Sequence, residues 1–587
     1  MSIPLERFGM IGDGETAALV SDGGSIDWLC LPRFDSPACC AALVGTPDHG
    51  HWSIAPQAPI TESGQRYDPD TLILETDLTT DGGAIRLTDF MPIRGHDPLL
   101  VRIVTGLAGN VSMCSTTALR FDYGNMPPWI ERHGDAIVCK VGPDEVLLHG
   151  QDGAEISQNA VHCRFDLAQG ERRVFMLTHR SFDRNANPPH DPPDAFELLD
   201  RTQRYWRDWI GRLDRHCDFG DALRRSLLTL KALVHRPTGG LVAAPTTSLP
   251  EKPGGNLNWD YRYCWLRDAS FTVSALIGSG FQDEAQAWRD WILRAVAGAP
   301  DKMGIAYRVD GSRRLEESEL SWLPGYRFAK PVRIGNAAAG QFQLDVYGEL
   351  MDTLHVCEAA GMQQSDQMRH LERAVADHVS RVWIEPDQGL WESRGEPHHY
   401  TYSKVMAWVA IDRLLRGTGG GDLTDEDRSR FEHLRNRIHD MVCREGFNEG
   451  LNSFTDYFGG QQVDASLLLL PKLGFLPADD PRMAATIATI EKRLMRDGLV
   501  YRNLSNDPVP EGAFLACTLW LAECQLLQGR LDDARACVER VLGLAGPLGL
   551  LSEEYDVGGK RLAGNFPQAL THIAVVNALL ALDQATA

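Results

Sequence analysis

The stretch NAAAGQFQLDVYGELMDTLHVC at residues 336–357 decides how the second half of the chain is built. Its large apolar residues recur at the i, i+3, i+4 and i+7 positions of one helix face. These residues are Tyr347, Leu350, Met351 and Leu354. Small or apolar residues occupy most other sides, so we expect a helix that is buried nearly all round, with Asn336 as its N-cap and Gly361 just past its end.

From about Phe219 onward, helices of this apolar kind alternate with a second kind. The second kind is amphipathic and heavily charged, which is typical of helices with one solvent-facing side. It covers residues 283–296, 365–383, 426–443, 481–496 and 531–544, and the apolar kind covers 336–357, 400–415, 463–470, 511–527 and 566–582. With the pair 219–234 and 267–280, six hairpins of one outer and one inner helix result. This repeat predicts an (α/α)6 toroid, with an open α-solenoid as the alternative.

Before residue 195 the pattern is short and alternating instead. Residues 71–78 and 85–88 flank the turn Asp81-Gly82-Gly83 and predict a β-hairpin, and residues 163–167 and 174–177 predict another across 169–171. Many such runs with Gly and Asp turns favour an antiparallel β-sandwich. The proline-rich stretch 185–193 marks a boundary. We therefore predict a β-sandwich domain over 1–195, a linker helix region over 196–218 and the helical domain over 219–587.

The composition narrows the kinds of molecule that the protein is expected to bind. The chain has 587 residues with a net charge of −22, which opposes binding to nucleic acid or an anionic membrane surface and suits a neutral substrate. The start resembles no signal peptide and we see no run apolar enough to span a bilayer, so a cytoplasmic protein is expected. The 13 cysteines lack zinc-like spacing and are expected to be reduced and mostly buried.

The residues that carry chemistry gather just before the apolar helices. They are the clusters WDYRYCWLRD at 259–268, WESR at 391–394, Glu511-Gly512, and SEEYD at 552–556. If the inner helices run parallel around a ring, all four clusters lie at one mouth of it. Indole rings suit the C–H faces of a sugar, and charged groups suit its vicinal hydroxyls. Hydrolysis of a glycosidic bond further needs two carboxyl groups that flank it.

Each feature also has an ordinary structural interpretation. A Trp next to a Glu on a loop usually packs, and Arg267 with Asp268 forms the kind of ion pair that caps a helix. His398 and His399 are neighbours that share no helix face, so we expect no metal site there. The glycines at 9–14 lack the Lys-Ser/Thr of a phosphate loop and are interpreted as a turn. No cofactor is expected.

These motifs resemble glycoside hydrolase family 15, the glucoamylase-like family, over nearly the whole chain. The opening IGDGETAALVSDGGSIDWLCLPRFDSPA is similar to the N-terminal β-domain of bacterial and archaeal members, many of which are trehalases. The blocks NWDYRYCWLRDAS, LPGYRFAKPVRIGNAAAGQFQLDVYGELMD, GLWESRGEPHHYTYSKVMAWVAIDR, EGAFLACTLWLAE, LLSEEYD and GNFPQALTH follow in the family's order.

The resemblance implies roles for particular residues. Glu392 matches the general acid and Glu553 the general base. Glu554 stands where glucoamylases usually have Gln, which makes it a competitor for the base. Arg267 and Asp268 match the pair that grips the innermost glucose. Further expected substrate-binding residues are Trp265, Trp391, Arg502 and Glu511.

The family inverts the anomeric configuration, so the resemblance implies two carboxyl groups roughly 6.5 to 9.5 Å apart with water between them. We expect burial beside Trp391 to raise the pKa of Glu392, and hydrogen bonds and water to keep Glu553 ionised. The first substrate expectation is α,α-trehalose, hydrolysed to two glucose molecules. The alternatives are a glucoamylase or isomaltose-type α-glucosidase, a sugar phosphorylase, and a non-catalytic carbohydrate-binding protein. The sequence makes no prediction of oligomeric state.

Overall fold

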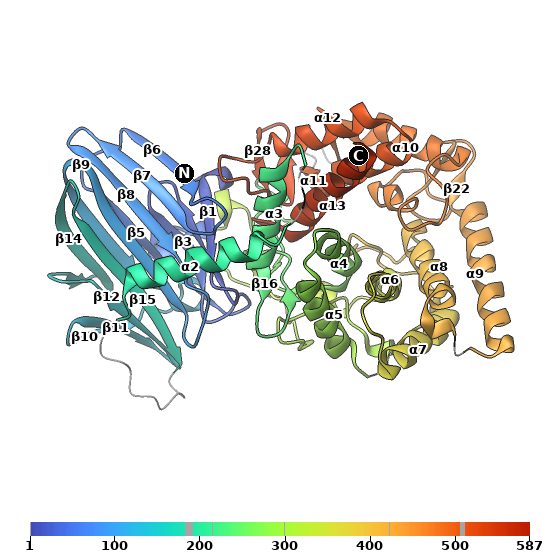
Figure 1. Cartoon of the computed structure of the whole chain (residues 1–587), viewed down its shortest axis with the longest axis horizontal. Helices are drawn as coiled ribbons and strands as arrows, with labels where there is room; N and C mark the ends of the chain where they lie inside the picture. Colours follow the sequence, from blue (N-terminus) through green and yellow to red (C-terminus); the bar gives the residue numbers. More distant parts are fainter. Residues whose placement is uncertain are drawn as a thin grey trace.

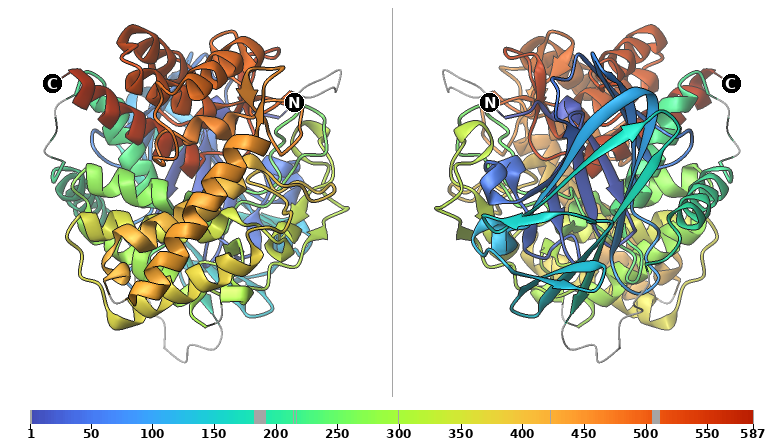
Figure 2. Two further views of the ribbon diagram at one scale, coloured as in Figure 1. Left: turned by 90° about the vertical axis from the view of Figure 1, so that its right-hand side faces the viewer. Right: turned by 90° about the vertical axis from the view of Figure 1, so that its left-hand side faces the viewer.

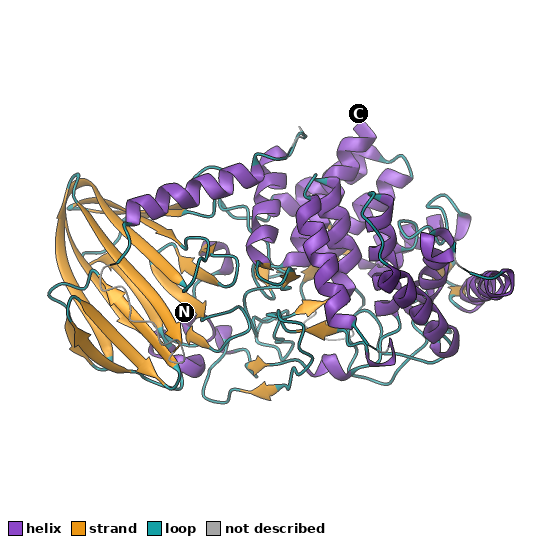
Figure 3. Cartoon of the chain, turned by 60° about the horizontal axis from the view of Figure 1, so that its bottom comes forward, coloured by secondary structure: helices purple, strands orange, loops and turns teal. Residues whose placement is uncertain are grey.

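The computed structural model describes residues 2–181, 192–213, 215, 217–298, 300–421, 423–504 and 511–586. Strands fill one end of the molecule and helices the other (Figures 1 and 3). An N-terminal antiparallel β-sheet domain is thus followed by a helical domain, as predicted. Residues 185–191 of the expected proline-rich boundary lie outside the described residues.

The β-domain is built around one long central strand, β9. Its first half pairs with β8 and β15, and its second half pairs with β5 and β14, all antiparallel. Figure 2 shows these strands crossing one end of the molecule. The strands are β1 (Phe8–Gly12), β2 (Ala17–Ser21), β3 (Ser25–Cys30), β4 (Ala38–Cys40), β5 (His51–Pro56), β6 (Glu62–Tyr67), β7 (Leu74–Thr80), β8 (Gly83–Phe90), β9 (Leu99–Ala118), β10 (Trp129–His133), β11 (Ala136–Val141), β12 (Asp144–His149), β13 (Glu155–Ser157), β14 (Ala160–Ala168) and β15 (Arg172–Ser181).

Of the two predicted hairpins, one is confirmed and one is wrong. Strands β7 and β8 pair across the Gly turn, with Leu78 opposite Ile85. Strands β14 and β15 do not pair with each other, because both follow β9 one after the other in the same direction. Residues 169–171 form a kink against β9 instead of a reversal. A Cβ on Gly106 would lie 2.1 Å from the carbonyl oxygen of Ala168, so the kink requires glycine there.

The two domains share one hydrophobic core, which contains buried residues of both. The indole of Trp28 in β3 donates to the carbonyl of Pro245 at 2.7 Å. The helix α2 (Ala195–Ile210) follows the β-domain and packs Ala195 and Leu198 on Val101 and Met176. The β-domain is therefore joined to the helical domain by continuous packing as well as by the chain.

The helical domain alternates buried and partly exposed helices, as predicted. The helices are α3 (Gly220–Leu233), α4 (Ala269–Gly278), α5 (Gln282–Val296), α6 (Asp345–Ala359), α7 (Asp366–Val382), α8 (Thr401–Arg416), α9 (Asp425–Glu445), α10 (Pro481–Leu494), α11 (Leu515–Leu527), α12 (Leu531–Leu542) and α13 (Ala569–Thr586). The buried α4 contacts α6, α6 contacts α8, and α11 contacts α13. Since α13 also contacts α4, the first and last buried helices meet.

Two predicted inner helices differ from the expectation. The helix expected over 336–357 begins at Asp345, and Asn336 instead caps a short 3-10 turn by accepting from the Ala338 N–H at 2.9 Å. Gly340, a poor helix former, is the last residue of this 3-10 turn. The helix expected over 463–470 is the 3-10 segment Ala465–Leu469. Pro471 follows directly and cannot continue a helical hydrogen-bond ladder.

The last helix also departs from the expectation that no stretch could span a bilayer. By length and composition α13 could cross a membrane, but 72% of the window is buried inside the protein. Such burial is typical of the core helix of a folded domain. All 13 cysteines fall within the described ranges, are free thiols and are mostly buried, as expected.

Candidate active site

A pocket of about 420 Å³ brings together residues from segments that precede the buried helices. Both predicted catalytic residues, Glu392 and Glu553, line it. The lining residues are Glu251, Asn256, Leu257, Trp259, Tyr261, Arg267, Arg333, Asn336, Trp391, Glu392, Ser393, Arg394, Arg502, Phe514 and Glu553. Residues far apart in the chain thus meet in one cavity that is rich in charge and aromatic surface.

Glu392 lies in a tight turn ahead of α8. Its φ of 56° is in the left-handed region, which is costly for a residue with a side chain, so the turn must be held by its surroundings. Gln341 supplies part of that hold, because its amide donates to the carbonyls of Glu392 and Ser393 at 3.2 and 3.0 Å. One carboxylate oxygen of Glu392 accepts from the indole of Trp265 at 2.7 Å and from Arg267 at 2.9 Å.

The surroundings of Glu392 differ from the apolar setting beside Trp391 that the sequence predicted. The indole N–H of Trp391 donates to the carboxylate of Asp464, at 2.9 and 3.0 Å to its two oxygens. The ring packs on Phe514, 5.2 Å away between centroids. Glu392 itself is ion-paired with Arg267, so its carboxyl group has charged and polar neighbours.

Glu553 is held at the start of a small sheet formed by β26 (Ala513–Phe514), β27 (Glu554–Asp556) and β28 (Arg561–Ala563). Its backbone N–H donates to Asn565 at 3.2 Å, and its carbonyl accepts from Leu515 at 3.1 Å. Successive residues of an extended chain point to opposite sides. Glu553 lines the pocket, whereas Glu554 is fully buried outside it and accepts from the Gly512 N–H at 2.9 Å.

The electrostatics of Glu553 contradict the expectation that water contact keeps it ionised. The residue is only 1% exposed, and burial raises its pKa well above the ordinary value. The charge of Glu251 raises this pKa further, while a hydrogen bond from Tyr261 and the charges of Arg502 and Arg267 lower it. Within the described residues, its Oε2 atom is buried and has no hydrogen-bond partner.

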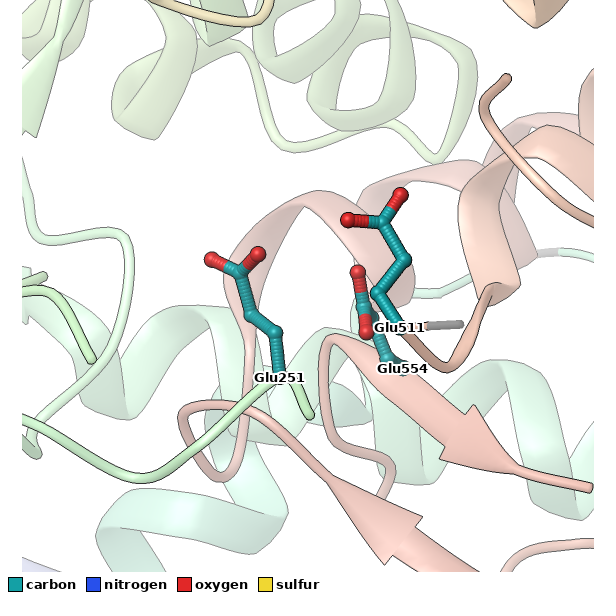
Figure 4. Close-up of side chains that lie close together, drawn as sticks. All are labelled: Glu251, Glu511 and Glu554. Carbon is teal, nitrogen blue, oxygen red and sulfur yellow. The ribbon is translucent and has the colours of Figure 1, made fainter. Parts of the chain in front are cut away.

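Beside Glu553 lies a set of three carboxylates, Glu251, Glu511 and Glu554, which we call the glutamate cluster. Their side chains converge from different segments, with one oxygen of each within 4.8 Å of the others (Figure 4). Arg502 donates to Glu251 at 2.6 Å and to both oxygens of Glu511 at 2.7 Å. The cluster therefore already contains a cation, which offsets part of the repulsion. Burial, with the charge of Glu511, still raises the pKa of Glu251 to about 7.

The predicted binding residues fall into two groups. Arg267, Trp391 and Arg502 line the pocket. The other three residues are not among those that line it, and each contacts one that is. Trp265 donates to Glu392, Asp268 accepts from Arg267 at 3.0 Å, and Glu511 accepts from Arg502.

Several pocket residues were not singled out from the sequence. Trp259 and Tyr261 lie in the cluster 259–268, whose sequence alone gives neither of them a particular role. Glu251 stands between Pro250 and Pro253, a pattern typical of an exposed turn, and no local signal indicates its burial. Arg333 and Asn336 are brought in by the loop before α6.

A pocket that combines two carboxyl groups, arginines and indoles on a helical domain of this kind is typical of a glycoside hydrolase. Residues 218–580 match the family model described as Glycosyl hydrolases family 15, and residues 1–162 match the one described as Trehalase-like, N-terminal. The chain belongs to glycosyl hydrolases family 15 and is a glycoside hydrolase.

Full-length relatives and a solved structure are similar to the chain. It is 34% identical to a protein named trehalase from Mycobacterium tuberculosis, over 98% of this chain and 89% of that protein. It is also 34% identical to a trehalase from Thermoplasma acidophilum, over 97% and 98%. A bacterial glucoamylase solved in complex with acarbose has the same fold, with a TM-score of 0.75 at 12% identity, over 100% of this chain and 95% of that one.

Proposed function

We propose that the protein is an inverting, exo-acting trehalase that hydrolyses α,α-trehalose to two glucose molecules. Glu392 acts as general acid and Glu553 as general base. The observation that carries this proposal is that both carboxyl groups line one pocket together with Arg267, Trp391 and Arg502. Similarity to two proteins named trehalase over nearly their full lengths supports the choice of substrate.

Each glutamate must leave its resting state to take its role, because burial raises the pKa of Glu553 and Arg267 holds Glu392 in an ion pair. The charges of Arg502 and Arg267 favour the ionised form of Glu553, which accepts a proton from the attacking water. Hydroxyl groups of the bound sugar compete for the donors of Arg267, which loosens its ion pair with Glu392 and lets that carboxyl group carry the proton for the leaving oxygen. An inverting reaction requires the carboxyl groups to stand roughly 6.5 to 9.5 Å apart, with room for one water molecule.

The proposed enzyme has a particular fold and particular domain limits. The ring of contacts from α4 through α6 and α8 to α11 and α13 supports an (α/α)6 toroid, in which the segment Ala465–Leu469 takes the place of one inner helix. The strands before it form a β-sandwich. The β-sandwich domain covers residues 1–195, the linker helix region 196–218 and the catalytic domain 219–587. The enzyme is cytoplasmic and acts on a small carbohydrate.

Substrate comparison tests the choice of trehalose. The purified protein is incubated with trehalose, maltose, isomaltose and starch, and released glucose is measured. The highest kcat/KM is expected for trehalose, and a higher value for maltose or isomaltose would identify a glucoamylase or isomaltose-type α-glucosidase instead. Glucose 1-phosphate formed only with added phosphate would identify a phosphorylase and remove Glu553 from its role as base.

Proton NMR of the first products tests inversion. Attack by water on the inverted side converts one half of trehalose to β-glucose, while the leaving half keeps its α configuration. Equal amounts of the two anomers are therefore expected before mutarotation. If only the α anomer appears early, the enzyme retains configuration and Glu553 is not a general base.

A further inference from the structure

The segment from Trp259 to Arg262 forms one wall of the pocket and presents different residues to its two sides. Trp259 and Tyr261 line the pocket. Between and after them stand Asp260 and Arg262, which are both fully buried and are not among the lining residues. The wall of the pocket therefore has a charged reverse side, and the stability of the wall depends on what that side contacts.

Arg262 connects this reverse side to the β-domain. It forms a two-point ion pair with Asp260, at 2.8 and 2.6 Å. Its remaining donors reach across to the β-domain, where one bonds to the carbonyl of Ser36 and another to the phenol oxygen of Tyr123, each at 2.8 Å. The guanidinium also lies 5.2 Å from the ring centroid of Tyr123. Every partner of this arginine other than Asp260 that we find in the described part of the chain belongs to the β-domain.

Asp260 extends the connection to a second part of the pocket. Its Oδ2 atom accepts from the backbone N–H of Gly335 at 3.0 Å. Gly335 has a φ of 74° and a Cβ there would lie 1.9 Å from the carbonyl of Glu316, so the loop is tightly confined at this point. Its neighbours Arg333 and Asn336 both line the pocket. One buried carboxylate thus links two pocket segments to Arg262 and, through it, to the β-domain.

We infer that Arg262 and Tyr123 are positioning residues, through which the β-domain holds Trp259, Tyr261 and the 333–336 loop in the geometry that catalysis needs. This inference rests on the proposed function. A buried arginine makes the connection stiff, because any shift leaves a charged donor unpaired away from water. A misplacement of about 1 Å in a catalytic wall can cost on the order of 100-fold in rate.

The experiment compares Tyr123→Phe and Arg262→Lys with the wild-type protein. Tyr123→Phe removes a single acceptor, and kcat/KM for trehalose should fall about 10-fold, mainly in kcat, since the pocket remains but its wall shifts. Arg262→Lys cannot make the two-point ion pair and both cross-domain bonds, so a larger loss is expected. Arg224→Gln is the matched control, because the Arg224–Asp70 ion pair at 2.6 Å also joins the helical domain to the β-domain and neither residue lines the pocket.

The pH profile separates positioning from general stability. A hydrogen bond from Tyr261 lowers the pKa of Glu553, so a displaced Tyr261 should move the low-pH limb of kcat/KM to higher pH in Tyr123→Phe but not in Arg224→Gln. Unchanged specific activity and pH profile in Tyr123→Phe, or equal losses in the control, would overturn the inference. A wild-type protein inactive on every α-glucoside would instead overturn the proposed function, so the two failures are distinct.

Discussion

The two carboxyl-bearing regions of the pocket are built in opposite ways. Glu392 sits on a strained turn with an arginine and an indole bonded to it. Glu553 sits beside a small sheet, buried, with further carboxylates nearby and one oxygen that has no partner among the described residues. One region surrounds its carboxyl group with donors, and the other crowds it with negative charge.

This difference shows that the sequence motif around a pocket residue does not determine the electrostatic environment of its side chain. Both glutamates stand in motifs that the sequence makes visible, yet their electrostatics come from residues far away in the chain. Arg267 is 125 positions from Glu392, and Glu251 precedes Glu553 by more than half the length of the protein. Substitutions in each environment test how strongly it determines whether a glutamate acts as acid or as base.

The largest effect is expected from amide replacement at each carboxyl group, measured with trehalose and with α-glucosyl fluoride. General acid or base catalysis contributes about 10² to 10⁴-fold, so Glu392→Gln and Glu553→Gln should each lose about that much kcat on trehalose. Fluoride leaves without protonation, so Glu392→Gln should still hydrolyse the fluoride, whereas Glu553→Gln should not. Measuring kcat for the four combinations checks the assignment.

The reverse pattern with the fluoride would exchange the roles of the two residues. The buried, raised-pKa Glu553 would then be the acid and the arginine-paired Glu392 the base. Circular dichroism and Tm of both variants serve as the control for folding. Activity of Glu392→Gln on trehalose within a few fold of wild type would remove that residue from the mechanism altogether.

The next effect concerns Arg267, which pairs with both Glu392 and Asp268. Arg267→Met leaves two carboxylates without their counter-charge and frees Glu392 from its position, so kcat/KM for trehalose should fall by on the order of 100-fold. Arg267→Lys keeps the charge but loses the planar fork, and an intermediate loss is expected. Steady-state kinetics of both variants provide the measurement.

A matched control exists on α5. Arg289, which is buried, forms an ion pair with the neighbouring, partly exposed Asp290 at 3.0 Å, as Arg267 does with Asp268, but does not line the pocket. Arg289→Lys should leave kcat/KM unchanged. If it reduced activity as much as Arg267→Lys does, the effect at Arg267 would be one of folding and not of the site.

A smaller effect, on pH dependence, is expected from Glu251→Gln. The charge of Glu251 raises the pKa of Glu553, so its removal lowers that pKa and should move the low-pH limb of kcat/KM to lower pH. Stability should respond as well. The pKa of Glu251 is about 7 in the folded protein, above its unfolded value, so its contribution to stability declines as pH rises from about 4.3 to 7, and the variant should lack this decline.

The pH profile of kcat/KM and urea unfolding at pH 5 and 8 test this prediction. Exposed Glu449→Gln, which removes one charge away from the pocket lining, is the control and should change neither. A low-pH limb that stays in place in Glu251→Gln would mean that the glutamate cluster does not act on the base.

The sequence pattern alone predicted much of the fold, and each wrong prediction has a physical cause. Period and polarity correctly separated the β-domain from the helical domain and the buried helices from the exposed ones. They failed at residues 336–344, where a short 3-10 turn ending in Gly340 delays the helix, and at 463–470, where Pro471 prevents a longer one. They also failed at 169–171, because a kink against a long partner strand has the same Gly-containing signature as a reversal.

The residues of the site could be predicted from the sequence only where several charged and aromatic residues stand together in one stretch of chain. Glu392 and Glu553 stand in such stretches and meet in one pocket. Glu251 stands alone between prolines, and the charges that act on it, Arg502 and Glu511, come more than two hundred positions later. The pKa of Glu553 was mispredicted for the same reason, since its neighbours in space are not its neighbours in sequence.

The smallest effect on activity is expected at Glu554, the residue next to the proposed base. Glu554 lies outside the pocket lining and accepts from Gly512, a bond that the amide oxygen of glutamine also makes. Glu554→Gln should therefore keep kcat within a few fold of wild type, while Glu553→Gln loses nearly all of it. Burial raises the pKa of Glu554 well above its unfolded value, so its wild-type contribution to stability is lost as pH rises, and the variant should have a higher Tm than wild type at pH 8 but not at pH 4. Equal loss of activity in the two variants would contradict the view that alternation along one strand separates the catalytic carboxyl group from a structural one.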